Sequence, residues 1–525
     1  MLKLVLGASG SGKTTLLYAR IRARAEAGKR SILLVPEQFT SSTEARIYRE
    51  LGDALSGMVE SYSFTSLAEH ILAMEGGAAV QTLTDAGRAV LVRRALEELQ
   101  DNVHYYYRHR RSAAFCQMAA ETIDELKSAG LSGQQLQELA RDCGTESAKL
   151  GELALIFQGY ESLLAGTGMD PADRLELAAD RLEAALARDE LPDFLREREV
   201  FIDEFDTFNA PKKRLMGAML AALPAVTVAL CEDGAPMQPG DLELFSGAKQ
   251  VAAQLRQLAR KNGAQVAAPE LLRRDLRHKD APGLAALTEL LETGSCTPPE
   301  SAPELRLFAA ASREEEARCA AAAIRRLMRQ GVRCGKIAVV CRDISLYRAA
   351  VRYEFRMAEI PLYCDEPTTP EFSAPATAVR ALLALLRGAD MTEQLTVLAK
   401  TGLCDLTEPE VCALENYAYT WSPNAAAWRA EFTKSPRGFG DAELTEEDTL
   451  NLTRAENARK KLVTAVDTLR SKVRSANAEQ ISRALYFCLK ELGAEGQQAA
   501  QVEDIRAARG IPAAEEAARE WNVVM

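Results

Sequence analysis

Near its first residue the chain reads Lys3-Leu4-Val5-Leu6 and then Gly7-Ala8-Ser9-Gly10-Ser11-Gly12-Lys13-Thr14, followed by the apolar helix start Thr15-Leu16-Leu17. A short apolar strand, a glycine-rich loop and a helix in this order predict a phosphate-binding loop, and a chance glycine turn rarely has all three. Glycines let successive backbone N–H groups surround phosphate oxygens. Lys13 is expected to reach the β and γ phosphates, and the Thr14 hydroxyl to bind Mg²⁺. The predicted nucleotide-binding residues are Gly7, Ala8, Ser9, Gly10, Ser11, Gly12, Lys13, Thr14 and Thr15.

A nucleotide-bound Mg²⁺ also needs a carboxylate, usually at the end of a neighbouring parallel strand. Residues 199–202 form a short apolar run of that kind, and Asp203 and Glu204 follow it directly. We expect Asp203 to bind the Mg²⁺ shell and Glu204 to polarise the attacking water. A buried strand that ends in a solvated acidic turn is an equal alternative for this segment alone. The glycine-rich loop favours the metal-binding interpretation.

Length and composition limit the class of protein. A chain of 525 residues is expected to form three or four domains, each with its own core. Its 11 cysteines include no C-x-x-C pair, and its four histidines do not cluster with them, which predicts reduced structural thiols and a cytoplasmic location. No signal-like segment precedes the first strand, and no uncharged apolar run is long enough to cross a membrane. We therefore expect a protein without membrane contact.

The formal net charge of −11 argues against a generally basic, nucleic-acid-binding surface. Contact with nucleic acid is therefore expected to be local, in a groove or channel. Two basic segments are candidates, at residues 104–111 and 273–279. The first interleaves tyrosines with cations, as base stacking and phosphate contact require. A solvated helix end or loop is the alternative for both segments, and the pattern alone slightly favours it.

The organisation along the chain alternates between α/β and helical segments. A parallel sheet covered by helices is predicted by four short apolar runs, at residues 2–6, 31–35, 200–203 and 225–231. Between about residues 84 and 191 the apolar spacing becomes helical, with Thr84 as the expected N-cap of the first helix. Residues 251–303 mix polar helix with Pro and Gly and are expected to form a boundary. Further strands at 305–308 and 337–342 predict a second α/β unit.

The expected fold class is therefore α/β. Two α/β lobes with helical insertions resemble the plan of the P-loop NTPases called superfamily 1 (UvrD-like) helicases. In that plan the expected domains are a first P-loop domain (1A) at 1–80 and 195–300, a helical insertion (1B) at 81–194, the start of a second domain (2A) at 301–390, and a second, truncated helical insertion (2B) at 391–525.

Several segments resemble the N-terminal half of the AddB (RexB-type) family, the helicase-like and nuclease subunits of AddAB complexes that process double-strand DNA breaks. The resemblance covers essentially all 525 residues. Besides the glycine-rich loop, it rests on Leu34-Val35-Pro36-Glu37-Gln38, Ser61-Tyr62-Ser63-Phe64-Thr65-Ser66-Leu67-Ala68, Phe201-Ile202-Asp203-Glu204-Phe205, residues 337–342, Leu398-Ala399-Lys400-Thr401-Gly402-Leu403 and Leu414-Glu415-Asn416-Tyr417-Ala418-Tyr419.

This resemblance implies an ATP- and Mg²⁺-binding part of a helicase-nuclease that resects double-strand breaks for homologous recombination. It also implies contact with single- and double-stranded DNA, scanning of the single strand for a Chi-type signal, and a heterodimer with an AddA-type subunit. A 4Fe-4S cluster and a nuclease Mg²⁺ site are implied only for the missing C-terminal half, so no nuclease activity is expected from these 525 residues.

The resemblance also places DNA-contact residues. By position, the candidates are Gln38, Thr40, Phe64 and Phe208. Amides pair with base edges and aromatic rings stack on base faces, so this chemistry is suitable. Ordinary core packing is an equal alternative for the two phenylalanines.

Some residues depart from the family pattern. Ser66 and Glu69 stand where some relatives carry Arg and Trp, whereas Glu204 stands where some relatives lack an acid. Arg342 lies where related helicases place an arginine that stabilises the transferring phosphoryl group, with a surface arginine as an equal alternative. No adenine-binding L-x-x-x-Q segment precedes the first strand, and no G-D-x-x-Q follows residues 229–234. We therefore expect ATP binding with weak motor activity or none.

Two alternatives stay open at this point. The chain could be an autonomous superfamily 1 DNA helicase and ATPase, or a P-loop ATPase unrelated to DNA. Stimulation of ATP turnover by DNA separates these alternatives from a scaffold whose main motor lies in a partner.

Overall fold

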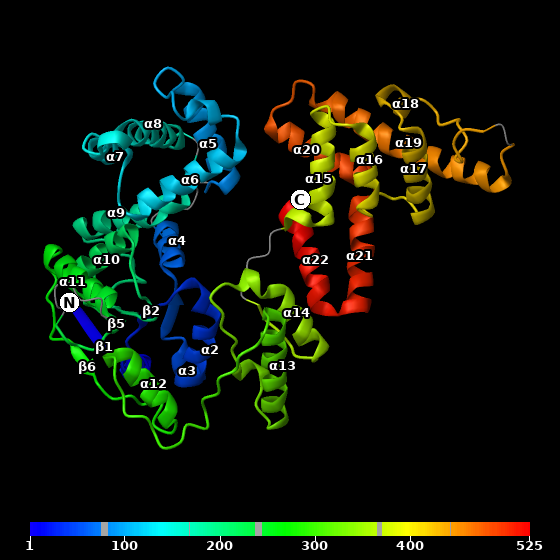
Figure 1. The fold of residues 1–525 in the computed structure, drawn as a ribbon. Coiled ribbons are helices and arrows are strands. Elements are labelled where there is room, and N and C mark those ends of the chain that lie inside the picture. Colours follow the sequence, from blue (N-terminus) through cyan, green and yellow to red (C-terminus); the bar gives the residue numbers. More distant parts are fainter. Residues whose placement is uncertain (75–81, 167, 237–243, 365–369, 441–442) are drawn as a thin grey trace. The chain divides into compact units, whose positions relative to one another are not determined.

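Two compact units, Met1–Phe308 and Ala309–Met525, make up the computed structural model of the chain (Figure 1). The residues described are 1–74, 82–166, 168–236, 244–364, 370–440 and 443–525. Each unit buries hydrophobic clusters of its own.

A parallel sheet of six strands forms the centre of the first unit. Its strands are β1 (Leu2–Gly7), β2 (Ser31–Leu34), β3 (Val59–Tyr62), β4 (Glu199–Ile202), β5 (Ala225–Cys231) and β6 (Glu270–Leu272). Their order across the sheet is β3-β2-β4-β5-β1-β6, and every neighbouring pair is parallel. The α/β prediction is confirmed, and the four predicted runs are β1, β2, β4 and β5. The sequence did not predict β3 or β6, because both are short and contain polar residues.

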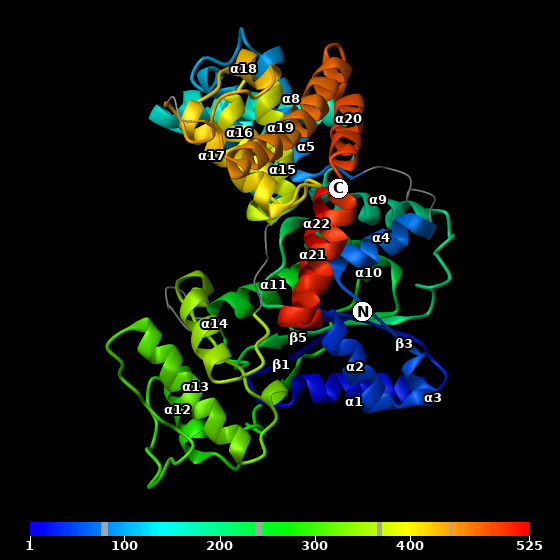
Figure 2. The same cartoon turned by 90° about the vertical axis from the view of Figure 1, so that its right-hand side faces the viewer.

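Different helices bury the two faces of the sheet, which Figure 2 shows with α1 and α3 below the strands and α4, α9 and α10 above them. The first layer contains α1 (Lys13–Glu26), the turn η1 (Glu37–Phe39), α2 (Thr40–Leu51) and α3 (Asp53–Ser56). The second layer contains α4 (Phe64–Met74), α9 (Arg174–Ala187), α10 (Ala210–Ala222) and α11 (Ser246–Lys261).

Alternation along the strands assigns each side chain to one of these layers. Val5, Leu33 and Phe201 pack with the side chains of α1 and α2. Leu4 and Ile32, one position away, pack with those of α4, α9, α10 and α11. Burial on both faces explains why the central strands read as continuous apolar runs rather than as alternating ones.

A helical part lies between α4 and α9 in the sequence. It contains α5 (Asp85–Glu98), η2 (Tyr107–His109), α6 (Ala113–Ser128), α7 (Gly133–Ala140), η3 (Gly144–Glu146), α8 (Ser147–Leu164) and η4 (Pro171–Asp173). Thr84 is the N-cap of α5, as predicted, and its hydroxyl accepts a hydrogen bond from the N–H of Gly87 at 3.2 Å. α5, α6 and α8 enclose a core of their own. α9, which the sequence assigned to this insertion, packs with α4 and α10 beside the sheet.

After β6, the helix α12 (Pro282–Thr293) is the last regular element of the first unit. The second unit is helical. Its elements are α13 (Arg313–Arg329), η5 (Cys334–Lys336), η6 (Ile344–Leu346), α14 (Arg348–Met357), η7 (Pro370–Phe372), α15 (Ala374–Leu386), α16 (Met391–Lys400), α17 (Glu408–Trp421), α18 (Ala425–Arg429), α19 (Glu446–Val473), α20 (Ala478–Glu491), α21 (Ala494–Arg509) and α22 (Ile511–Val524). None of the helices within the described ranges combines the length and apolar character needed to cross a membrane.

The two strands predicted for a second α/β unit are not formed, because neither 305–308 nor 337–342 is a strand and the described residues of 309–525 contain none. In the segment 337–342, Val340 is 91% exposed, and in the segment 305–308, Leu307 is 99% exposed. A strand needs a neighbour to satisfy its backbone N–H and C=O groups, and an apolar run alone does not supply one. The strand predictions at 305–308 and 337–342 are therefore wrong.

Candidate nucleotide-binding site

One cavity of the first unit brings together residues from distant segments of the sequence. It lies at the carboxyl ends of β1, β4 and β5 and has a volume of about 460 Å³. Its lining consists of Ser9, Gly10, Gly12, Lys13, Thr14, Thr15, Arg46, Asp203, Glu204, Phe205, Asp206, Ala229, Cys231, Leu276 and Arg277. We call it the glycine-loop cavity. Lys13 and Asp203 therefore meet at one site.

The order of the strands explains this meeting. β5 pairs with both β1 and β4, so β1 and β4 lie on either side of it. Neighbouring strands are about 4.8 Å apart, which separates β1 from β4 by roughly 10 Å. Because the strands are parallel, the glycine-rich loop after β1 and the acidic residues after β4 project from the same edge of the sheet. The cavity lies between the two segments.

Glycines give the loop between β1 and α1 its shape. Gly10 has a φ of 82°, and Gly12, directly before α1, has a φ of 92°, a backbone conformation that residues with side chains rarely adopt. The first N–H groups of α1 have no partners within the helix, so this end of α1 presents donors and a partial positive charge beside the cavity. Of the predicted loop residues, Gly7, Ala8 and Ser11 are not part of the lining.

Lys13 is folded back against this loop. Its ammonium group donates to the carbonyl oxygens of Gly7, at 2.6 Å, and Ala8, at 2.9 Å. Burial lowers the pKa of Lys13, and nearby acidic groups that include Asp203 oppose this change. A phosphate is a stronger partner for an ammonium group than a neutral carbonyl. Lys13 is thus placed where an incoming phosphate can replace these two bonds.

Asp203 and Glu204 stand at the opposite side of the cavity. Asp203 is 5% exposed, and its N–H donates to the carbonyl oxygen of Leu34 at 3.1 Å, which extends the β4–β2 pairing by one residue. Its Oδ1 accepts the N–H of Glu204 at 3.0 Å. Glu204 has a φ of 66°, a strained value for a residue with a side chain. Burial, together with the charge of Asp203, raises the pKa of Glu204. A raised pKa makes this carboxylate a better proton acceptor.

Two arginines at the cavity were not predicted as site residues. Arg46, from α2, lies over the ring of Tyr18 at 4.6 Å from its centroid. Arg277 donates to Ser9 Oγ at 3.2 Å, and the N–H of Leu276 donates to the carbonyl oxygen of Gly10 at 3.0 Å. Arg277 belongs to the basic segment 273–279, for which the sequence offered a nucleic-acid patch or a solvated loop. That segment packs on the glycine-rich loop because β6 pairs with β1.

Arg342, the arginine predicted to stabilise the transferring phosphoryl group, belongs to the second unit and is exposed there. It lies in the segment 337–342 that forms no strand. Its contact with a nucleotide stays a prediction. The pairing of β6 with β1, which places Arg277 at the loop, joins segments about 265 residues apart and leaves no local signal in the sequence.

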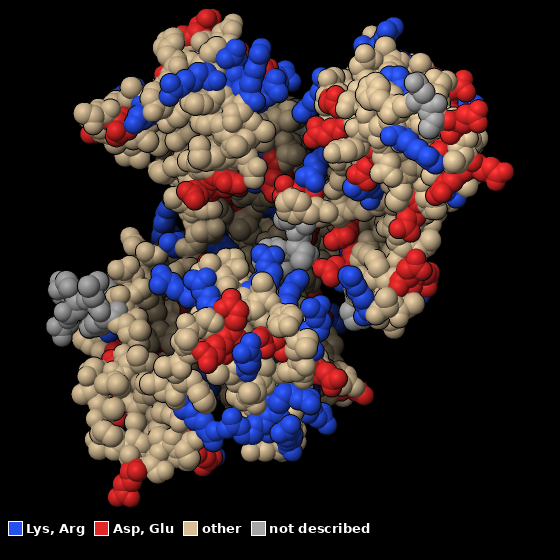
Figure 3. Space-filling view, turned by 45° about the vertical axis from the view of Figure 1, so that its right-hand side comes forward, with Lys and Arg blue, Asp and Glu red and all other residues tan. Residues whose placement is uncertain are grey.

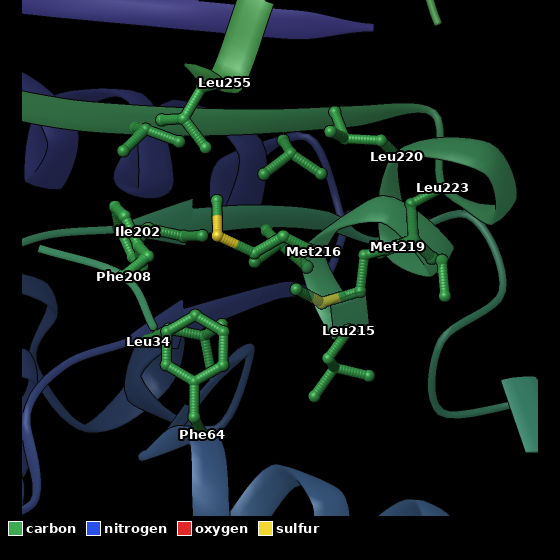
Figure 4. Packing of buried hydrophobic residues seen from close by; sticks show 14 of the residues in the cluster. Leu34, Phe64, Ile202, Phe208, Leu215, Met216, Met219, Leu220, Leu223 and Leu255 are labelled. Carbon is green, nitrogen blue, oxygen red and sulfur yellow. The ribbon is translucent and has the colours of Figure 1, made fainter. Parts of the chain in front are cut away.

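The four predicted DNA-contact residues fall into two groups. Gln38 is exposed in η1, and Thr40 begins α2 with its hydroxyl donating to the carbonyl oxygen of Glu37 at 3.0 Å. Phe64 and Phe208 are instead 2% and 4% exposed in the core between the sheet and the layer of α4, α9, α10 and α11 (Figure 4). Their rings lie 6.0 Å apart in an edge-to-face arrangement. This burial favours the packing alternative over base stacking for both phenylalanines.

The donor set at the cavity suits a magnesium-bound nucleotide. Thr14 offers a hydroxyl and Asp203 a carboxylate, both oxygen ligands of the kind that Mg²⁺ prefers when it also binds phosphates. In the described ranges no group of three or more His, Cys, Asp and Glu side chains is placed to hold a metal ion by itself. A metal at this site would therefore need the oxygens of the nucleotide as further ligands.

Comparisons with known proteins identify a family model and named relatives that match this chain. The family model described as "ADDB, N-terminal" matches residues 4–288. The B subunit of the ATP-dependent helicase/deoxyribonuclease of Moorella thermoacetica is 30% identical across 100% of this chain and 46% of its own length. Proteins of the same name from Desulforudis audaxviator and Heliobacterium modesticaldum are 29% and 28% identical across 100% of this chain, and 46% and 44% of their own lengths. The chain thus spans about half the length of the curated relatives it matches.

Proposed function

Because this chain belongs to the "ADDB, N-terminal" family, we propose that it is the helicase-like, ATP- and DNA-binding part of an AddB-type subunit. The proposed role of the whole subunit is in a helicase-nuclease that resects double-strand DNA breaks for homologous recombination and scans the single strand for a Chi-type signal. Its proposed partners are single- and double-stranded DNA and an AddA-type subunit. The relatives are named as one subunit of an enzyme, which supports a partner subunit.

The observation that carries this proposal is that Lys13 and Asp203 line one cavity. In the proposed complex the triphosphate of ATP lies along residues 9–15, and the Lys13 ammonium exchanges two carbonyl partners for phosphate oxygens. The Thr14 hydroxyl and the Asp203 carboxylate hold the Mg²⁺ shell. The metal, when bound, offsets the negative charge of the phosphates.

The same cavity supports a role for this chain's side chains in hydrolysis. Glu204 has a raised pKa and can accept a proton from an attacking water. Arg46 and Arg277 supply positive charge at the lining, where charge builds up on a transferring phosphoryl group. Arg342 remains a further candidate for that task. The presence of Glu204 favours the second candidate function, an autonomous superfamily 1 DNA helicase and ATPase.

Replacing the loop lysine tests the nucleotide-binding proposal. In the 525-residue chain, Lys13→Ala is expected to weaken the binding of Mg·ATP by about 10- to 100-fold, since charged hydrogen bonds contribute roughly 1.5–3 kcal/mol. Isothermal titration calorimetry measures this change. The matched control is Lys29→Ala, which removes an exposed lysine just beyond α1. Unchanged affinity in the Lys13 variant would exclude the assignment.

ATP turnover with and without DNA separates three possibilities. Strong stimulation by DNA of the isolated full-length subunit favours the autonomous helicase, whereas binding without substantial turnover favours a scaffold whose motor lies in the partner. Turnover that is indifferent to DNA favours an ATPase unrelated to DNA. Glu204→Gln identifies the source of any turnover, because it removes the proton acceptor and keeps the size of the side chain.

A further inference from the structure

A turn between α5 and α6, residues 104–111, has a shape that is set by one carboxylate. Glu152, on α8, accepts the backbone N–H groups of His104 at 2.9 Å, Tyr105 at 2.9 Å and Tyr106 at 3.2 Å. Partial burial opposes its ionisation, but the three backbone hydrogen bonds outweigh burial and lower the pKa of Glu152. The backbone of this segment, which we call the basic turn, is therefore held in place, and the charge of Glu152 is satisfied within it.

The tyrosine rings of the basic turn already have partners. The Arg110 guanidinium lies 3.9 Å from the centroid of the Tyr107 ring. Tyr106 stacks on Phe115, with centroids 5.5 Å apart. Arg108 and Lys149 both lie within 6 Å of the centroid of the Tyr105 ring, at 5.6 Å and 5.4 Å. Base stacking, which the sequence pattern suggested, would have to displace these contacts.

The arginines of the basic turn are not neutralised. Among the described residues, Arg108, Arg110 and Arg111 form no ion pair with a carboxylate, whereas Arg93 and Arg94 on the neighbouring α5 pair with Glu97 and Glu98 at 3.1 Å and 3.0 Å. Figure 3 shows Lys and Arg side chains gathered at the outer end of this helical part, at the upper left. In a chain of net charge −11, such a group makes a local positive surface.

We propose that the basic turn binds the phosphate backbone of duplex DNA, without regard to sequence. The proposal rests on the proposed function, that this chain acts on DNA, and it adds the surface that contacts the duplex. Uncompensated guanidinium groups on a fixed backbone suit phosphates, because they give up little freedom on binding. The tyrosines support the arginines and are not platforms for bases. Binding by phosphate contact alone favours the duplex, whose charge density is higher than that of a single strand.

The test compares two sets of substitutions in the 525-residue chain without nucleotide. One variant combines Arg108→Gln, Arg110→Gln and Arg111→Gln. The control combines Arg93→Gln and Arg94→Gln, which removes arginines that are already paired. Fluorescence anisotropy with a blunt duplex and with an oligo-dT strand is measured over a series of salt concentrations. The slope of log affinity against log salt for the duplex is expected to fall by about 2–3 in the first variant, near 0.9 for each phosphate that is no longer neutralised, and to stay unchanged in the control.

Other outcomes would contradict the proposal or one part of it. An unchanged duplex slope in the triple variant, or an equal fall in the control, would overturn the proposal. A larger loss for oligo-dT than for the duplex would overturn the preference for duplex. Arg111→Gln alone guards against misfolding, because Arg111 is exposed, and it is expected to lower the slope by about 0.9. Failure of Lys13→Ala to alter ATP binding would count against the nucleotide site and leave this result standing.

Discussion

At Gly10, backbone conformation and close packing both require a residue without a side chain. Its φ is 82°, and a Cβ atom there would lie 2.8 Å from Asp275 Oδ1 and 2.9 Å from Arg277 Cβ. Gly10→Ala is therefore expected to cost about 1–2 kcal/mol for the left-handed conformation and to push away the segment that carries Arg277. Urea denaturation should show the loss of stability, and calorimetry should show weaker Mg·ATP binding.

Gly28→Ala is the matched control for this prediction. Gly28 has a φ of 71°, but its added Cβ would meet no atom within 4 Å. The same backbone cost is expected, with Mg·ATP affinity unchanged. If both variants lose nucleotide affinity to the same extent, the contact between residues 275–277 and the loop does not shape the cavity.

Single residues also show what a local sequence pattern can and cannot predict. Lys13 and Asp203 could be chosen as candidate site residues from their neighbours alone, because a glycine-rich loop surrounds Lys13 and an apolar strand precedes Asp203. Phe64 has no such pattern. An aromatic residue next to polar ones can face a core or a ligand, and only its 2% exposure separates the two. Arg277 was not predicted to lie at the cavity, because a basic run in the sequence resembles a solvated loop. Only its hydrogen bond to Ser9 in the folded chain reveals its position.

At the scale of elements, a buried polar network joins the helices of the insertion. Lys127, on α6, donates to Asp170 Oδ2 at 3.2 Å and to Asp173 at 2.8 Å. Tyr160, on α8, donates to the same Asp170 oxygen at 2.7 Å. Asp170 is fully buried. A carboxylate can be kept in such a place only when it is paired, so this network specifies how α6, α8 and η4 meet.

Asp170→Asn is expected to destabilise the first unit by about 1–3 kcal/mol, since it weakens a charged hydrogen bond to Lys127. Although burial opposes ionisation, Lys127 and the other donors lower the pKa of Asp170 in the folded protein. A lowered carboxyl pKa contributes stability above the ordinary pKa of about 4, and this contribution is lost as the pH falls through the folded value. Thermal denaturation followed by circular dichroism should therefore show the difference between variant and wild type shrinking below about pH 4.

The exposed Asp101→Asn provides the comparison for that experiment, because Asp101 lies on the surface of the same helical part. It is expected to leave both the midpoint and its pH dependence unchanged. A variant at Asp170 that is as stable as the wild type at neutral pH would show that the network adds nothing to stability.

At the scale of the whole molecule, the two units have separate cores and should unfold separately. All three tryptophans, Trp421, Trp428 and Trp521, belong to the second unit, so tryptophan fluorescence follows that unit alone. If Mg·ATP binds at the glycine-loop cavity as proposed, it should stabilise only the first unit, by about 2.7 kcal/mol at a hundredfold excess over Kd. Saturating Mg·ATP is therefore expected to raise the circular dichroism midpoint of one transition and to leave the tryptophan transition where it is.

A single transition that both probes follow together, and that shifts as a whole with Mg·ATP, would contradict this expectation. It would mean that the units unfold cooperatively. Lys13→Ala serves as the control, because its tryptophan transition should match that of the wild type while the shift with nucleotide disappears.

Local patterns in the sequence determined the glycine-rich loop, the acidic end of β4 and four of the six strands, because each depends on residues that are adjacent in the chain. The tertiary structure decided the rest. It brought Lys13, Asp203, Arg46 and Arg277 to one cavity, because the order of parallel strands is set by packing between segments that are distant in the sequence. Residues 337–342 form no strand in the tertiary structure, because a β-strand exists only where another backbone lies beside it.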